Sequence, residues 1–256
     1  MIDLTVVDDV ARITLNAPAK LNALDAQGLH DLGAAYDEAE AAGVRALVLV
    51  GEGRAFCAGR DIAGVDPRTD DVAGFLGGLV TPLLQRMSRF PAPTFAAAHG
   101  ACLGVGLGLL IATDVVYVAE SAKIGSPFAA LGAALDSGGH ALLVDRLGAH
   151  RALDLIYTGR LMSGEEAVAA GLFSRSFPDD EVHAAATDAA TTAARGATAA
   201  FLASKRLIAR LRDERLTLWE TVDLENATQA ALRDTDDYRE GFAAFQQKRS
   251  PRFVGH

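Results

Sequence analysis

The order in which short apolar segments follow one another constrains the fold more than any other feature of the sequence. Residues Leu4–Val7 and Ala11–Asn16 alternate apolar and polar side chains on either side of two aspartates, a pattern that predicts a β-hairpin. Apolar residues then recur at helical spacing over 25–42, and Gly43 is a natural end for that helix. The β-branched run Val44–Val50 predicts a buried strand directly afterwards.

Strands and helices continue to alternate up to about residue 119, and helices follow one another in the later part of the chain. The patterns predict a helix over about 72–89, a strand at 94–98, a helix over 104–112 and a strand at 115–119. After Gly138 the chain is predicted to be almost wholly helical as far as Phe245. Strands that alternate with helices favour an α/β layer architecture. The late helices form either a second domain or an arm that packs on a partner subunit.

Composition excludes several classes of protein. The 256 residues are enough for one large core, and length alone allows one or two domains. The most apolar stretch, 94–118, is interrupted by His99, glycines and Asp114, so we expect no membrane-spanning helix. The start has no basic segment followed by an apolar run, and the two cysteines have no metal or redox spacing. We therefore expect a cytoplasmic, reduced protein without a metal site, and the net charge of −9 argues against nucleic-acid binding.

Two glycine-containing segments are candidates for binding through backbone N–H groups. Ala55–Ile62 follows the strand at 44–50, and its glycine permits a turn that points N–H groups outward, although an ordinary strand-to-loop turn remains the alternative. His99–Gly108 follows a strand and opens a helix, whose free N–H groups can bind an anion. A dinucleotide loop is disfavoured there by the G-x-G-x-G spacing. Close packing of the helix on the sheet through small residues is the remaining alternative.

A third segment, Leu135–Gly139, precedes another predicted helix. Asp136 is well placed to cap that helix, since aspartate is among the preferred N-cap residues. The cap and a role in a binding site are compatible, because a capping residue can also face a cavity.

Taken in order, these segments resemble the crotonase (enoyl-CoA hydratase/isomerase) superfamily, and the resemblance covers nearly the whole chain. The matching motifs are Lys20-Leu21-Asn22-Ala23-Leu24, the two glycine-containing segments, Ala119–Gly125, Thr158-Gly159-Arg160, Glu166-Ala167, Gly171-Leu172 and Glu240–Arg249. The resemblance implies an α/β spiral of ββα units with a helical C-terminal region used for trimerisation. It therefore predicts an acyl-CoA-binding core over 1–197 and an oligomerisation region over 198–256, assembled as a homotrimer or a dimer of trimers.

The resemblance also implies an oxyanion hole for the carbonyl of an acyl-CoA thioester. By motif matching its two backbone N–H donors are Arg60, which follows Ala58-Gly59, and Val105, which lies within Gly104-Val105-Gly106. The chain is acidic whereas coenzyme A is anionic, so local cations and backbone groups must bind the coenzyme. The residues that the resemblance assigns to CoA binding are Lys20, Leu21, Ala58, Asp61, Ile62, Phe245 and Lys248, the last two reaching the CoA of a neighbouring subunit.

The sequence departs from the family pattern at the positions of the two glutamates that handle water in true hydratases. Gly108 stands at the first position and Phe128 at the second, and neither side chain can transfer a proton. Asp136 remains, at a place where some family members carry an acid. The run Asp136-Ser137-Gly138-Gly139 is most similar to epoxyphenylacetyl-CoA isomerases. The expected acyl pocket around Asp136 includes Phe128, Leu131 and Leu135.

A single carboxylate suits a reaction that takes a proton from one carbon and returns it to another, because one base can become the acid within a turnover. We therefore expect an enoyl-CoA-type isomerase with Asp136 as the acid/base, acting in fatty acid metabolism. The alternatives are an enoyl-CoA hydratase with atypical residues, a dehalogenase with Asp136 as nucleophile, a non-catalytic acyl-CoA binder and a plain scaffold. No separate cofactor is expected, since coenzyme A is part of the substrate.

Overall fold

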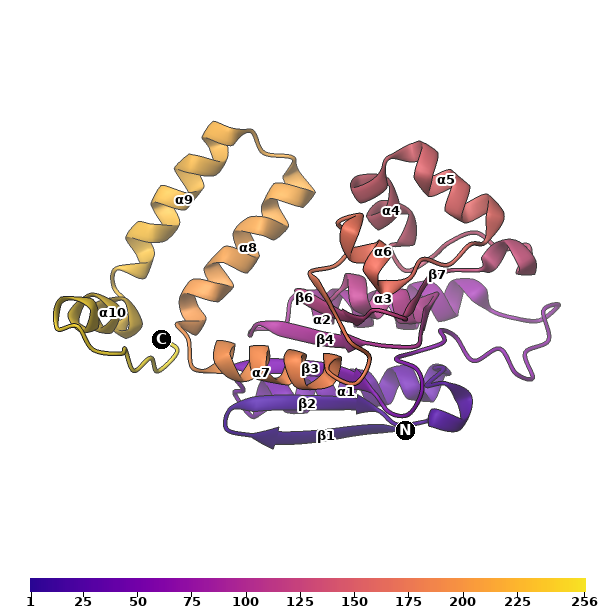
Figure 1. Cartoon of the computed structure of the whole chain (residues 1–256), viewed down its shortest axis with the longest axis horizontal. Helices are drawn as coiled ribbons and strands as arrows, with labels where there is room; N and C mark the ends of the chain where they lie inside the picture. The colour runs from indigo at the N-terminus through magenta and orange to yellow at the C-terminus, as the bar shows by residue number, and fades with distance from the viewer.

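A six-stranded sheet runs through the centre of the protein, whose computed structural model describes residues 1–256 (Figure 1). The strand order is β1-β2-β3-β4-β6-β8, with β1 and β2 antiparallel and every other pair parallel. The strands are β1 Ile2–Val7, β2 Val10–Leu15, β3 Ala46–Gly51, β4 Thr94–Ala98, β6 Val115–Ala119 and β8 Arg175–Phe177. All six residues of β3 are buried, as expected of a parallel strand with helices on both faces.

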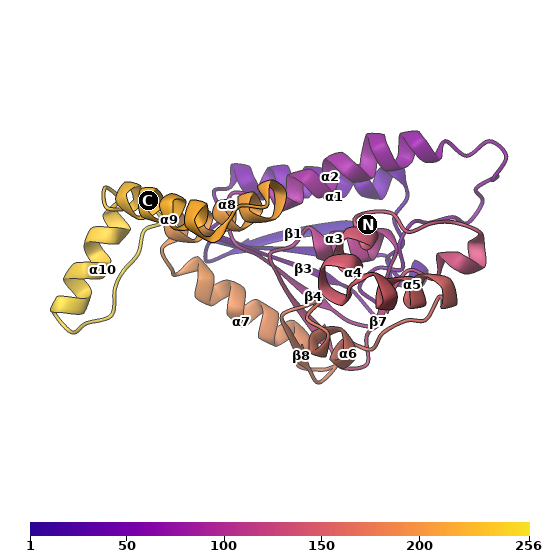
Figure 2. The same cartoon turned by 90° about the horizontal axis from the view of Figure 1, so that it is seen from above.

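Helices cover both faces of this sheet (Figure 2). On one face lie α1, Ala26–Ala41, and α2, Thr81–Ser88. On the other lies α7, Val182–Ala194, which packs across β3, β4 and β6. The α7 side chains that face the sheet are small alanines four residues apart, including Ala186 and Ala190, so the helix backbone comes close to the strands.

The remaining elements gather at the carboxyl ends of the strands or extend the chain beyond the sheet. A second, two-stranded parallel sheet joins β5, Ala101–Leu103, to β7, Lys123–Gly125. The other elements are η1 Pro18–Lys20, η2 Gly74–Val80, α3 Val105–Ile111, η3 Phe128–Leu131, α4 Gly139–Leu147, α5 Ala149–Thr158, α6 Gly164–Ala169, α8 Thr198–Glu214, α9 Leu218–Leu232 and α10 Asp236–Gln246. None of the helices combines the length and apolar character needed to cross a membrane.

Most of the elements predicted from periodicity are confirmed, and the differences have physical causes. The predicted hairpin is β1–β2, and Asp25 caps α1 by accepting a hydrogen bond from the Gly28 N–H. The helix predicted over 72–89 is divided into a π-helix, η2, and α2. The prediction of an almost wholly helical chain after Gly138 is wrong at β8, a three-residue strand too short to leave a periodic pattern.

The helices α8 and α9 form an antiparallel pair that projects away from the sheet (Figures 1 and 2). Two basic side chains hold this arm to the core. Arg45, just before β3, donates hydrogen bonds to the Gly196 carbonyl and the Thr198 hydroxyl at the start of α8. Lys205, on α8, pairs with Asp114 at 2.9 Å and donates to the Phe90 carbonyl. The arm begins at the residue where the sequence places the oligomerisation region, and that division stays a prediction.

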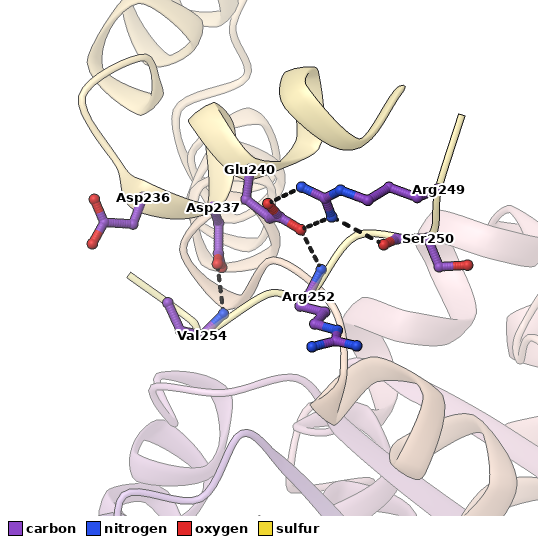
Figure 3. A pocket seen from close by; sticks show the side chains of 7 residues that line it. All are labelled: Asp236, Asp237, Glu240, Arg249, Ser250, Arg252 and Val254. Carbon is purple, nitrogen blue, oxygen red and sulfur yellow. Dashed lines mark hydrogen bonds and ion pairs between the residues drawn. The ribbon is translucent and has the colours of Figure 1, made fainter. Parts of the chain in front are cut away.

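The C-terminal residues fold back along α10 and are held by two of its carboxylates (Figure 3). Glu240 accepts two hydrogen bonds from the Arg249 guanidinium and one from the Arg252 N–H. The buried Asp237 accepts from the N–H groups of Val254 and the glycine that follows. The charged side chains around the hollow of about 710 Å³ at this place are therefore largely satisfied by the chain itself.

A pair of histidines joins α7 to the loop that leaves β4. His99 Nε2 lies 2.9 Å from the Gly53 carbonyl oxygen, which can only accept, so this nitrogen carries the hydrogen. His99 Nδ1 then accepts from His183 Nε2 at 3.1 Å. Burial, followed by the nearby His99 and Arg12, lowers the pKa of His183 from 6.5 to about 4. The folded protein therefore favours the neutral His183 ring.

This pKa shift makes the stability depend on pH. Between about pH 6.5 and pH 4 the unfolded chain binds a proton at residue 183 that the folded chain excludes. The contribution of His183 is therefore complete above about pH 6.5 and is lost as the pH falls toward 4. Urea unfolding of the wild type and of His183→Gln at a series of pH values checks this. The difference between the two free energies of unfolding should shrink on acidification, and a constant difference would contradict the assignment.

Candidate active site

Two chain segments that are distant in sequence are held together by backbone hydrogen bonds at the carboxyl ends of the strands. The first segment, 17–24, lies beside the second, 55–61. The Ala58 N–H donates to the Leu21 carbonyl at 2.9 Å, and the Leu24 N–H donates to the Gly59 carbonyl at 2.8 Å. The Asp61 N–H returns to the Leu24 carbonyl at 2.9 Å. These bonds make Leu24 and Arg60 partners in a short parallel bridge.

This bridge leaves the Arg60 N–H without an acceptor in the protein. The carbonyl of Gly59 and the N–H of Asp61 both point toward Leu24. Because the polar groups of an extended backbone alternate in direction, the N–H of the residue between them points to the opposite side. No hydrogen bond from it occurs in the structure.

The Val105 N–H is free for a different reason. Val105 is the first residue of α3, and the first N–H groups of a helix have no partner within the helix. Gly104 precedes it at φ 53, a left-handed conformation that suits glycine, and donates its own N–H to the Gly125 carbonyl. The loop is joined to the Ala55–Asp61 segment through Cys57, whose N–H donates to the Ala101 carbonyl and whose carbonyl accepts from Leu103.

The two free N–H groups therefore belong to loops that pack against one another. A Cβ added to Gly59 would lie 2.8 Å from the Leu103 carbonyl oxygen and 3.5 Å from the Val105 nitrogen. A Cβ added to Gly106 would overlap the Cys57 carbonyl oxygen. Bare backbone at both glycines is what allows the loops to approach this closely.

Cys57 and Cys102, which pair in the bridge between the two segments, are buried, free thiols. Burial raises the pKa of Cys57 to about 12, so its thiol is protonated at neutral pH. Burial therefore disfavours a thiolate nucleophile at this place, and the polar groups that the two segments offer are those of the backbone.

Asp136 occupies a tight turn before α4. The Gly139 N–H donates to the Asp136 carbonyl at 2.8 Å, which closes the turn. The prediction that Asp136 caps α4 is wrong, because the N-cap is Gly138 and no side chain accepts from the first turn of the helix. The Asp136 carboxylate instead accepts a hydrogen bond from its neighbour, with Ser137 Oγ at 2.8 Å from Asp136 Oδ1. Its other oxygen, Oδ2, has no partner in the chain.

The turn rests on the first part of α3. A Cβ added to Gly108 would lie 2.5 Å from Ser137 Cβ and 3.0 Å from the Ser137 carbonyl oxygen. Gly108 is three residues after Val105, so Asp136 lies in a turn that packs within one helical turn of the free Val105 N–H. The space that a side chain at position 108 would need is filled by Ser137.

The structure brings two of the three predicted acyl-pocket residues to this place. Phe128 lies against Gly104, where an added Cβ would meet its ring at 2.9 Å. Leu135 is buried beside Gly139. Leu131 is 62% exposed, so in the single chain it does not line an enclosed pocket.

The residues predicted to bind CoA fall into two groups. Lys20 lies beside the paired loops and its Nζ is 2.7 Å from Asp61 Oδ2, a contact that lowers the pKa of the Asp61 carboxyl. Leu21 and Ala58 are joined by the backbone bond described above, and Ile62 is exposed on the same loop. Phe245 lies in the last turn of α10 and Lys248 just after the helix, and α10 lies at the opposite end of the molecule from α4 (Figures 1 and 2).

Two side chains hold this site together in ways that the sequence did not predict. Asn22 is buried and donates to the Glu52 and Ala55 carbonyls, so it fastens the Lys20–Leu21 segment to the next loop. The Arg60 guanidinium pairs with both oxygens of Asp70 and stacks 4.1 Å from the centre of the Phe75 ring, which anchors η2 above the loop. The sequence shows only an asparagine within a loop, and its burial, which requires hydrogen-bond partners, is visible only in the structure.

Comparison with known proteins identifies the group to which this chain is related. The family model described as enoyl-CoA hydratase/isomerase matches residues 6–256. A 1,2-epoxyphenylacetyl-CoA isomerase from Escherichia coli is 34% identical over 251 residues, 96% of this chain and 95% of that protein. A Rhodobacter capsulatus protein named "Probable enoyl-CoA hydratase" is 36% identical over 249 residues, 97% of this chain and 95% of the relative. The crystal structure of an enoyl-CoA hydratase from Bacillus anthracis superimposes with a TM-score of 0.90 at 30% identity, covering 100% of this chain and 99% of the other.

The close approach of the two loops predicts a large effect of one added methyl group. Gly106→Ala should destabilise the protein by about 1–3 kcal/mol and separate the loops, because its Cβ meets backbone that cannot move independently. Thermal unfolding measures the change. The matched control is Gly77→Ala in η2, where an added Cβ meets nothing within 4 Å and the melting temperature should be unchanged or higher. Equal melting temperatures for both variants would contradict the packing argument.

Proposed function

The chain belongs to the enoyl-CoA hydratase/isomerase family, and we propose that it is an acyl-CoA isomerase that uses Asp136 as its single proton carrier. The observation that carries this proposal is the contact of Ser137 with Gly108, beside a carboxylate whose second oxygen is free. The site therefore holds one proton-transfer group and no space for a second carboxylate at position 108.

The thioester carbonyl oxygen of the substrate binds the N–H groups of Arg60 and Val105 in this mechanism. Negative charge develops on that oxygen when a neighbouring C–H loses its proton, and fixed backbone dipoles stabilise it without reorganisation. Loss of one donor from a comparable site costs about 2.7–4 kcal/mol in transition-state stabilisation. The burial of Val105 and the absence of an internal acceptor for either N–H support this role.

Asp136 then moves one proton. Its carboxylate removes a proton from a carbon of the acyl chain, and the C–H electron pair becomes the enolate stabilised by the two N–H groups. The protonated Asp136 returns the same proton to a different carbon, and the double bond ends in its new position. Atoms and charge balance without water or an added cofactor, and a single group serves as base and then as acid.

Hydration makes a different demand on the site. Water must lose a proton to a base while the α-carbon gains one, and the positions for those two groups carry Gly108 and Phe128. Hydratase activity remains the second candidate because several relatives, including the Rhodobacter capsulatus protein, are named for it. In that case Asp136 would have to act both as the base for water and as the acid for the α-carbon.

Asp136→Asn tests the proposal because asparagine keeps the size and the Oδ1 acceptor of the aspartate. Conversion of a 3-enoyl-CoA to the conjugated 2-enoyl isomer and turnover of 1,2-epoxyphenylacetyl-CoA are the isomerase assays. We expect the variant to lose about 10²–10⁴-fold in kcat, the usual contribution of general acid–base catalysis, with an unchanged melting temperature. Full activity of the variant, or a wild type that hydrates a 2-enoyl-CoA but turns over neither isomerase substrate, would contradict it.

The proposed assembly is a trimer or a dimer of trimers, in which α10 of one chain reaches the CoA of the next. The arm and α10 expose large apolar side chains, among them Trp219 (73%) and Phe245 (86%). A largely apolar hollow of about 400 Å³ lies between α8, α9 and α10 and is lined in part by Phe242. These surfaces favour burial against another chain, since apolar area removed from water contributes roughly 25 cal/mol per Å².

The position of Lys248 leads to a prediction about CoA affinity. Lys248→Ala should raise the Kd for CoA without changing the mass of the assembly, because a cation close to the phosphates is lost while the apolar contacts remain. Calorimetric titration with CoA measures the affinity, and light scattering should give a mass that is a multiple of three chains. Lys123→Ala, an exposed lysine on β7, is the control. Equal affinities in the two variants, or a monomeric mass, would contradict the proposal.

A further inference from the structure

The turn that carries Asp136 is held in a conformation that its sequence does not favour. Ser137 has φ 52 and Gly138 has φ 90, so both central residues of the turn closed by the Gly139 N–H are left-handed. Positive φ at both central positions is the pattern of a type I′ turn, which selects glycine, asparagine or aspartate. Serine at the first central position is therefore conformationally unfavourable. The contacts of its side chain are the place to look for a compensating role.

The Ser137 hydroxyl makes one hydrogen bond, and that bond is to Asp136. The hydroxyl donates to Asp136 Oδ1 at 2.8 Å, and the Asp136 carboxylate accepts no other hydrogen bond within the chain. One carboxylate oxygen is thus fixed, and the second is left for a different partner. Asp136 is half-buried. Within the chain, only this hydrogen bond and local packing restrain the rotation of its carboxylate.

The backbone of α3 also fixes the position of Ser137. Ser137 Cβ, Oγ and the carbonyl oxygen all lie within 3.3 Å of the place where a Gly108 side chain would begin. Gly108 is fully within α3 and buried, so Ser137 rests on a rigid surface one helical turn from Val105. The hydroxyl therefore connects the position of Asp136 to the helix that supplies a free N–H.

We propose that Ser137 is a positioning residue, which holds Asp136 Oδ1 and directs Oδ2 toward the acyl chain by resting on the bare backbone of Gly108. The proposal rests on the proposed role of Asp136 as the proton carrier. Ser137 touches no reacting atom in this account. It accounts for three otherwise unconnected observations, which are the strained serine, the missing side chain at Gly108 and the single hydrogen bond of the carboxylate.

Two substitutions separate this role from a purely structural one. Ser137→Ala deletes the hydroxyl but keeps the Cβ and the strained φ, whereas Ser137→Gly deletes the hydroxyl and relieves the strain. Both should lower kcat for the 3-enoyl-CoA by about 10- to 100-fold, the usual range for a hydrogen bond to a charged group, while KM changes little. Ser163→Ala is the matched control, because it removes a 3.0 Å hydrogen bond to a serine hydroxyl at the start of α6, outside both loops and the Asp136 turn, and should keep the wild-type kcat.

A third variant tests the coupling. In an Asp136→Asn background, Ser137→Ala should produce no further loss, because the group that the serine orients no longer transfers a proton. The inference about Ser137 is overturned, with the proposed function intact, if Asp136→Asn is inactive while both Ser137 variants keep kcat within about twofold. An equal further loss in the double variant would assign Ser137 a structural role instead. Full activity of Asp136→Asn alone would overturn the proposed function, and this inference with it.

Discussion

The approach of two backbone loops at Cys57 is the contact on which the rest of the site depends. The Cys57 N–H and carbonyl bond to Ala101 and Leu103, and this places the first residue of α3 beside the turn that contains Gly59. Each loop supplies one N–H that no internal acceptor uses, the first because of its direction in a parallel bridge and the second because it begins a helix. A donor pair built in this way is independent of side-chain identity, which explains how Arg and Val can occupy its positions.

Under the proposed function, the contact between Gly108 and Ser137 limits the site to a single acid/base. A helix residue without a side chain admits the Asp136 turn, and the turn in turn occupies the space that a larger residue would need. A side chain at position 108 and the Asp136 turn therefore cannot occupy this space together. In the proposed mechanism the acid/base is carried on a tight turn and not on the helix, and the Ser137 hydroxyl restrains its carboxylate.

The sequence was sufficient to predict the elements with strong periodicity and the positions of the site loops, but not the contacts between them. β3 and α1 were predictable because a run of apolar residues and a capped amphipathic helix leave long patterns. β5, β7 and β8 have three residues each, so they are specified by their partners rather than by their own sequence. The capping role of Asp136 was a reasonable local prediction that failed, because the carboxylate bonds to Ser137 and the left-handed Gly138 begins the helix. The contact of Ser137 with Gly108 joins residues 29 apart in the sequence, so only the folded structure shows it.

In the proposed complex one thioester oxygen meets both free N–H groups while Asp136 faces the acyl chain. A crystal structure with a bound, unreactive acyl-CoA analogue would show whether it does. The carbonyl oxygen should lie about 2.7–3.1 Å from the Arg60 and Val105 nitrogens, with Asp136 Oδ2 against the carbons beyond the thioester and Oδ1 still bonded to Ser137. A thioester oxygen that meets neither nitrogen, or an acyl chain that leads away from Asp136, would contradict the proposed complex.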